Sequence, residues 1–137
     1  KGGINVPMII SGNQVNRFGQ DENALINTTD LFATITELCG VNNQAVYDSK
    51  SFIDLLTSSI NSNSRDYIYS EIGNENYTIR NNTHKYIHFE NGNEALFNLN
   101  NNQLEFPNLL NTNQLPLSDL NNLNKTDLIN KLEEIRN

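Results

Sequence analysis

The 137-residue sequence has one cysteine, Cys39, and no tryptophan, and it contains only three prolines. A single cysteine excludes an internal disulfide and a thiolate metal cluster, because both need at least two thiols from the chain. No apolar run approaches the roughly 20 residues that a membrane-spanning helix needs. The first residues, Lys1-Gly2-Gly3-Ile4, contain no initiator methionine and no basic-then-apolar leader. We therefore expect this opening to come from the middle of a longer protein.

Positive charge is also scarce. Nine basic residues stand against sixteen acidic ones, which leaves a net charge of -7. A chain with this balance repels phosphate backbones and anionic lipid surfaces, so nucleic acid and membrane are not expected as partners.

Apolar residues make up only 36% of the chain, while asparagine is abundant in runs such as residues 100–102. Globular domains usually reach roughly 45–50% by a count that includes glycine. This composition indicates a thin core, or apolar surface that is buried against something outside the chain. A compositional habit of the source genome would produce the same bias.

The first half has few elements. Residues 6–10 (Val-Pro-Met-Ile-Ile) are typical of a short strand buried on both faces. Residues 28–30 offer capping oxygens for a helix that would bury Leu31, Ile35 and Leu38 and end at Gly40. A Ser/Asn-rich connector at residues 57–64 then indicates a boundary. We predict two domains, residues 1–60 and residues 61–137.

The second half alternates with the period of strands. Four strands are predicted at residues 66–71, 77–80, 85–89 and 95–99, with turns at residues 81–83 and 91–92. A helix at residues 125–136 would begin with a capping box of Asn124 and Asp127 and bury Leu128, Leu132 and Ile135. The fold class is α/β, ending in a small antiparallel sheet packed with a C-terminal helix.

Chemistry-bearing residues do not form a recognisable centre. Cys39 has no basic neighbour that would lower its pKa, so we interpret it as a small buried hydrophobe. His84 and His88 lie four residues apart in a strand region, where this spacing does not create a helical metal site. The acidic residues near the terminal helix are expected to form a solvated face: Asp119, Asp127, Glu133 and Glu134. From residue types alone we expect no catalytic residue and no metal ligand in this stretch.

Several segments, read in order, resemble the sulfatases, the formylglycine-dependent branch of the alkaline phosphatase superfamily. Residues 1–10 (KGGINVPMII) resemble that family's E-G-G-I-R-V-P segment, and residues 27–41 resemble its D-L-F-P-T-I-x-E-L-A-G-V helix. Residues 48–56 resemble D-G-x-S-L-x-x-L-L, and residues 65–71 resemble the strand that opens the C-terminal subdomain. Residues 77–87 and 94–110 resemble A-I-R-T-x-x-Y-K-Y-I and E-E-L-Y-D-L-x-x-D-P-x-E-x-x-N-L. The resemblance covers about residues 1–110.

The chain departs from the family at four positions, where Lys1, Asn5, Ala33 and Asn98 replace the usual Glu, Arg, Pro and Asp. The family's C-x-P-S-R motif, whose Cys becomes formylglycine, has no counterpart, because Cys39 is followed by Gly40-Val41. The family's metal ligands also lie upstream of this region. The resemblance thus implies the C-terminal fragment of an alkaline-phosphatase-like sandwich, inactive when isolated.

The complete enzyme would use formylglycine and a divalent metal, usually calcium, to hydrolyse a sulfated carbohydrate or an aryl sulfate. Its missing N-terminal catalytic region would be the partner of this stretch, which would help to wall the substrate cleft. Candidate substrate-binding residues are Asn74, Asn76 and His88. By analogy with the family, the location would be periplasmic or extracellular, although the sequence itself leaves it open.

Two alternatives stay open at this point. The same fold could serve phosphodiester, phosphonate or phosphoethanolamine chemistry, which only the missing nucleophile segment distinguishes. The stretch could also be a non-catalytic module that binds carbohydrate or protein through its sheet.

Overall fold

A computed structural model describes residues 4–41, 47–58, 65–73, 75–100 and 104–137. The chain forms two compact units. Lys1–Val6 and Tyr67–Asn137 belong to the first, here named the sheet unit, and Pro7–Asp66 form the second, the helical unit. The predicted domain boundary at residues 60 and 61 falls within a stretch outside the described residues. In the described part, no helix has the length and apolarity to cross a membrane.

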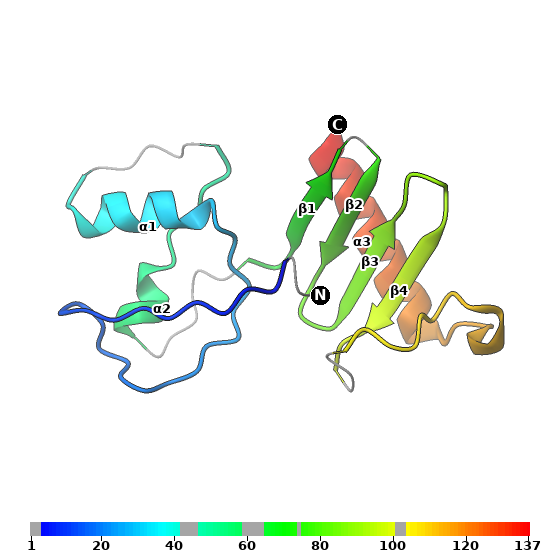
Figure 1. Cartoon of the computed structure of the whole chain (residues 1–137), viewed down its shortest axis with the longest axis horizontal. Coiled ribbons are helices and arrows are strands. Elements are labelled where there is room, and N and C mark those ends of the chain that lie inside the picture. The colour runs from blue at the N-terminus through cyan, green and yellow to red at the C-terminus, as the bar shows by residue number, and fades with distance from the viewer. Residues whose placement is uncertain (1–3, 42–46, 59–64, 74, 101–103) are drawn as a thin grey trace. The chain divides into compact units, whose positions relative to one another are not determined.

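The sheet unit contains four antiparallel strands in the order β1-β2-β3-β4, with α3 lying across one face (Figure 1). The strands are β1(Ile68–Ile72), β2(Asn76–Arg80), β3(His84–His88) and β4(Glu94–Asn98). Each of the predicted strands is therefore confirmed to within a residue or two at its ends. The fold class, an α/β chain with a small antiparallel sheet and a C-terminal helix, is confirmed as well.

Asparagine side chains build the predicted hairpin turns. The Asn81 Oδ1 accepts hydrogen bonds from the backbone N–H groups of Thr83 (2.9 Å) and His84 (2.8 Å). In the next turn, Asn91 Oδ1 accepts from Asn93 N–H (3.0 Å), and Gly92 takes a φ of 79°, which side chains disfavour. Asn is common in turns because its side chain can replace a backbone partner in this way.

Helix α3 (Asp119–Arg136) begins earlier than expected. Its N-cap is Ser118, whose side chain accepts a hydrogen bond from Asn121 N–H. The predicted capping box was wrong. Since Ser118 caps the first turn, Asn124 lies inside the helix. Its Nδ2 donates to the Leu120 carbonyl (2.9 Å).

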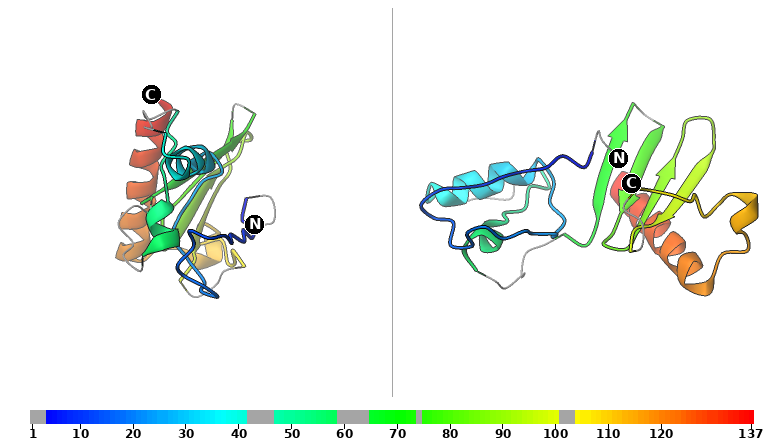
Figure 2. Two further views of the ribbon diagram at one scale, coloured as in Figure 1. Left: turned by 90° about the vertical axis from the view of Figure 1, so that its left-hand side faces the viewer. Right: turned by 60° about the horizontal axis from the view of Figure 1, so that its bottom comes forward.

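The core of the sheet unit lies between the sheet and α3, and Figure 2 shows the helix lying along one face of the sheet. Strand register places Tyr69, Ile79, Tyr86 and Leu96 side by side across the four strands, so their side chains share one face. Two predicted helix residues, Leu128 and Leu132, pack against this row. The third, Ile135, is 43% exposed and lies outside the core.

On the opposite sheet face, Lys85 is buried and its Nζ lies 3.0 Å from Glu105 Oε1. Arg80 is the cross-strand neighbour of Lys85, and burial lowers the pKa of its guanidinium despite attraction from Glu105. Like charges opposite each other on neighbouring strands repel, so Glu105 compensates a pair that would otherwise destabilise the sheet.

The helical unit contains α1 (Asp30–Leu38) and α2 (Ile53–Thr57). Gly40 follows α1 with φ 71°, as predicted for a residue that ends a helix. The strand predicted at residues 6–10 was wrong. Those residues form no strand, and Val6 and Ile9 are 72% and 94% exposed. A strand buried on both faces needs neighbouring strands, and the described residues offer it none.

Helix α1 buries only part of the predicted face, on which Leu31 and Leu38 are half-buried. Its buried residues are Asp30, Ala33 and Thr34, whereas Ile35 is 55% exposed. Cys39, expected to be buried, is exposed. Hydrogen bonds explain the choice of face. Thr34 Oγ1 accepts from Phe52 N–H (3.1 Å), which draws the polar side of α1 toward the segment before α2.

Candidate functional site

The polar row, defined as Glu71, Tyr77, His88 and Glu94, crosses one end of the sheet. These residues are successive cross-strand partners from β1 to β4. Partners in an antiparallel sheet point to the same face, and strand alternation makes this the face covered by α3. Side chains that are up to 23 positions apart (94 minus 71) in the sequence therefore meet in one line.

Aromatic and cationic groups stack within this row. The Tyr77 and His88 rings are parallel to within 7°, with centroids 4.6 Å apart. Arg136, from the last turn of α3, places its guanidinium carbon 4.3 Å from the Tyr77 ring centroid. Electrostatic attraction between a cation and an aromatic face favours this geometry. The stack thus joins β2, β3 and the end of α3.

Hydrogen bonds fix Arg136 in this position. Its Nη1 donates to Tyr69 Oη (3.0 Å) and to Glu71 Oε2 (3.3 Å), and Tyr69 also donates to the Glu71 carboxylate. The contact with Tyr69 raises the pKa of the Arg136 guanidinium. Burial and the bond to Glu71 together raise the pKa of the Tyr69 hydroxyl, so both groups keep their protons at neutral pH.

At the other end of the row, Glu94 accepts two hydrogen bonds. Lys125 Nζ donates to Oε2 (2.8 Å) and Tyr86 Oη donates to Oε1 (2.5 Å). These two bonds hold the pKa of the Glu94 carboxyl below its usual value. Burial, with the nearby carboxylate, raises the pKa of Tyr86 well above the ordinary tyrosine value. Glu94 is therefore an ionised acceptor and Tyr86 a fixed donor.

A pocket of about 370 Å³ lies between the row and α3. Its walls are Tyr77, Tyr86, His88 and Glu94 from the sheet, with Ile129, Leu132, Glu133, Arg136 and Asn137 from the helix side. We call it the wedge pocket. Its size falls in the range of about 300–1,000 Å³ typical of small-molecule sites, and it combines flat rings with a few polar groups.

The three predicted substrate-binding residues do not lie together. His88 is in the polar row and lines the wedge pocket. Asn76 follows the opposite alternation from Tyr77, and its Oδ1 accepts from Glu90 N–H (3.2 Å), which joins the start of β2 to the turn after β3. Asn74 lies outside the described residues. The structure thus brings His88, but not Asn76, into the pocket.

The sequence patterns did not identify four of the pocket residues: Tyr77, Tyr86, Glu94 and Arg136. Glu133 was predicted to lie on a solvated face. Glu133 is exposed but also lines the wedge pocket. Alternation within each strand predicts which residues share a face with Tyr77 and which share a face with His88, but it does not relate the two strands. Only the register shows that the two residues face the same side and that the end of α3 lies over it.

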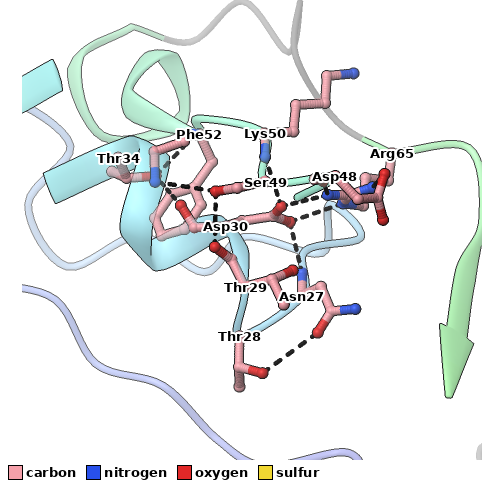
Figure 3. A network of polar contacts seen from close by, with 11 residues as sticks. Asn27, Thr28, Thr29, Asp30, Thr34, Asp48, Ser49, Lys50, Phe52 and Arg65 are labelled. Carbon is pink, nitrogen blue, oxygen red and sulfur yellow. Dashed lines mark hydrogen bonds and ion pairs between the residues drawn. The ribbon is translucent and has the colours of Figure 1, made fainter. Parts of the chain in front are cut away.

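A second polar cluster surrounds Asp30 in the helical unit (Figure 3). Asp30 is 1% exposed, and its Oδ2 accepts from Asn27 N–H (2.7 Å) and Arg65 Nε (2.8 Å). Its Oδ1 accepts from Lys50 N–H (2.8 Å) and from Arg65 Nη2. Burial alone would favour the neutral acid, but these bonds outweigh it and lower the pKa of Asp30. With both oxygens satisfied inside the protein, this cluster holds chain segments together and offers no acceptor to a ligand.

Metal ligands do not gather in the described residues, which contain no group of three His, Cys, Asp or Glu side chains able to hold an ion. The exposed Cys39 precedes Gly40-Val41 rather than a nucleophile motif. The described residues therefore do not fit calcium or formylglycine.

Comparison with known proteins adds a family and a set of folds. The family described as N-sulphoglucosamine sulphohydrolase, C-terminal, matches residues 1–137. No curated protein matches the chain.

Similar solved structures include a candidate sulfatase from Bacteroides thetaiotaomicron VPI-5482, with TM-score 0.62 and 20% identity over 77% of this chain and 23% of that one. A 2-O GAG sulfatase has TM-score 0.62 and 21% identity over 79% of this chain and 25% of its own. A protein in complex with its substrate, D-glucosamine-2-N,6-O-disulfate, has TM-score 0.58 and 20% identity over 78% and 23%. At these identities the shared feature is the fold. The chain spans about a quarter of the length of these relatives.

Proposed function

This chain belongs to the N-sulphoglucosamine sulphohydrolase C-terminal family and is the C-terminal region of a sulfatase. We propose that the complete protein hydrolyses sulfate esters of carbohydrates and that this chain forms a wall of its substrate cleft. The observation that carries the proposal is the family match over the whole chain. A similar solved structure that holds a sulfated glucosamine as its substrate supports the choice of carbohydrate over aryl sulfate.

The helical unit supports the idea that further protein completes this fold. Large apolar side chains stay exposed on it, among them Phe32 (50%), Ile35 (55%) and Val41 (56%) on α1 or just after it. Exposed apolar patches of this kind mark surfaces that other protein covers. The remainder of the enzyme, about three times the length of this stretch in the solved relatives, would cover them.

The wedge pocket is the part of this chain that we assign to the substrate. The Tyr77–His88 stack offers a flat aromatic edge against which a sugar ring can pack. Arg136 and Glu133, which also line the pocket, place a cation and a carboxylate beside it. Nucleophile and metal would come from the rest of the complete enzyme, where formylglycine and a divalent ion such as calcium would supply the chemistry. This chain's residues would only bind and orient the sugar.

The test is a steady-state assay of sulfate release from sulfated glucosamine by the complete protein. In the proposed site the His88 imidazole would make one hydrogen bond to a sugar hydroxyl. We expect His88→Phe to raise KM roughly fivefold while kcat holds, because phenylalanine keeps the stack with Tyr77 but cannot make that hydrogen bond. Asn82→Ala, an exposed change in the β2–β3 turn, is the matched control. An unchanged KM for His88→Phe would remove the wedge pocket from the substrate site.

The same assay separates sulfur from phosphorus chemistry. Matched phosphate monoesters and diesters should release phosphate far more slowly than the sulfate ester releases sulfate. Faster turnover of any phosphorus ester would favour the phosphodiester, phosphonate or phosphoethanolamine alternative. The 137 residues without the remainder of the enzyme should show no turnover, with or without calcium.

A further inference from the structure

An open groove on the sheet unit, which shares only Glu94 with the wedge pocket, has no role in the proposed function. The turn from β3 to β4 forms one wall, Leu110, Asn111 and Leu115–Leu117 form the other, and Asn108, Asn122 and Lys125 also line the groove. We call it the amide groove. Its volume of about 1410 Å³ exceeds the range of about 300–1,000 Å³ typical of small-molecule sites, and it opens widely to solvent. A ligand of several linked units suits such dimensions.

Both walls are preformed by hydrogen bonds. On one side, Asn108 Oδ1 accepts from Leu96 N–H (3.0 Å) and Leu110 N–H (3.1 Å), which ties the segment to the edge of β4. On the other, Gly92 N–H donates to the Phe89 carbonyl (2.8 Å) and Phe89 N–H to the Asn93 carbonyl (2.9 Å). A groove with walls fixed in advance loses little entropy when it binds.

The charges in the groove cancel. Lys125 and Glu94 both line it, and their side chains are bonded to each other at 2.8 Å. A sulfated or phosphorylated chain would find no uncompensated cation among the lining residues, and a metal ion would find a single carboxylate. The groove therefore favours an uncharged ligand.

The remaining lining combines apolar surface with amides. Phe89 is 39% and Leu115 is 51% exposed. Asn93 and Asn111 are exposed, and within the described residues their side-chain amides make no hydrogen bond to protein. An amide both donates and accepts, which matches neighbouring hydroxyls on a sugar ring, while an aromatic side chain packs against the ring's C–H face.

We propose that the amide groove binds an uncharged oligosaccharide segment, with Phe89 as the packing surface and Asn93 and Asn111 as hydrogen-bonding groups. All of these residues belong to the sheet unit, so they lie within one compact part of this chain. The proposal does not depend on which ester the complete protein cuts.

The test is a ¹H–¹⁵N NMR titration of the 137-residue chain with three neutral tetrasaccharides: cellotetraose, chitotetraose and maltotetraose. At least one should shift the amide signals of residues 89–93 and 110–117 in a saturable way. Phe89→Ala should weaken that binding roughly fivefold or more, and Asn111→Ala roughly threefold to fivefold, the factor for one hydrogen bond of ordinary net strength. Because Asn111 is exposed, its variant tests the site without risk to the fold.

Two matched controls remove the same side-chain types elsewhere. Phe18→Ala and Asn82→Ala alter exposed residues outside the groove and should leave the affinity unchanged. A heparin-type sulfated tetrasaccharide should bind the groove more weakly than the neutral probe. The proposal is overturned if no neutral probe shifts these signals at about 10 mM, if Phe89→Ala and Asn111→Ala bind like the unchanged chain, or if the sulfated probe binds the groove more tightly.

Discussion

The two units of this chain are stabilised in different ways. The sheet unit has a continuous apolar core in which Ile79, Leu96 and Leu128 are fully buried. The helical unit buries few apolar residues, and at its centre lies the carboxylate of Asp30. Apolar burial is non-directional and needs only area, whereas a buried carboxylate is tolerated only when every lone pair finds a donor.

This difference indicates where the stability of each unit comes from. A sheet with a helix over one face can complete a core within a single short stretch. The helical unit instead leaves Ile9 94% and Phe32 50% exposed, as expected for the margin of a larger core. Substitutions or pH changes that affect one unit and leave the other intact test this difference in stabilisation.

The largest effect is expected from Leu128→Ala. This side chain is fully buried against the sheet, so its removal should lower the free energy of unfolding of the sheet unit by about 3 kcal/mol through lost burial and a residual cavity. Residue-resolved hydrogen exchange in a urea series would measure it. Leu123→Ala, on the same helix but 68% exposed, should change this quantity by less than about 0.5 kcal/mol. Equal losses in the two variants would contradict the described packing of α3.

A smaller effect, larger in the helical unit than in the sheet unit, should follow acidification. The native pKa of Asp30 is lowered, so its carboxylate stabilises the fold above the unfolded value of about 3.9, and this stabilisation is lost as pH falls through the lower native pKa. Hydrogen exchange of residues 27–34 measured from pH 5 downward should reveal the loss. The Glu94 pKa is lowered too, but its side chain is 35% exposed, so solvent screening makes the matching loss in the sheet unit smaller.

Asp30→Asn sharpens this test. The variant should be less stable at neutral pH, because the Arg65 guanidinium keeps a neutral partner in place of an ionised one. The acid dependence of the helical unit should fall to the smaller contribution of the more exposed Glu22, whose pKa is lowered by the hydrogen bond from Arg17. A variant that retains the same acid dependence would show that another group titrates there.

The smallest effect concerns where α3 begins. Ser118→Ala removes the N-cap acceptor and should destabilise the sheet unit by about 1 kcal/mol. Asn130→Ala, at an exposed interior position of the same helix, should be neutral or slightly stabilising because alanine has the higher helix propensity. If Ser118→Ala has no effect on the exchange of residues 119–122, the helix begins elsewhere.

Local patterns in the sequence determined most of the secondary structure of the sheet unit and the end of one helix. Strand alternation, the Asn turns and Gly40 act within a few residues of the chain, so the four strands and the end of α1 could be predicted. The family resemblance also came from segment order alone, and the family match confirms it. His88 was a candidate because the family resemblance implies that this sheet walls the cleft, and the local pattern places His88 at the end of a strand.

Only the tertiary structure decided the rest. Residues 6–10 have the composition of a buried strand but find no partner strand among the described residues. Helix α1 turns Asp30 inward because Arg65, 35 positions later, supplies donors. The stack of Arg136, Tyr77 and His88 depends on strand register and on the path of α3. Such contacts form between residues far apart in sequence, so no local pattern encodes them. Which side chains meet is determined by the free energy of the assembled fold.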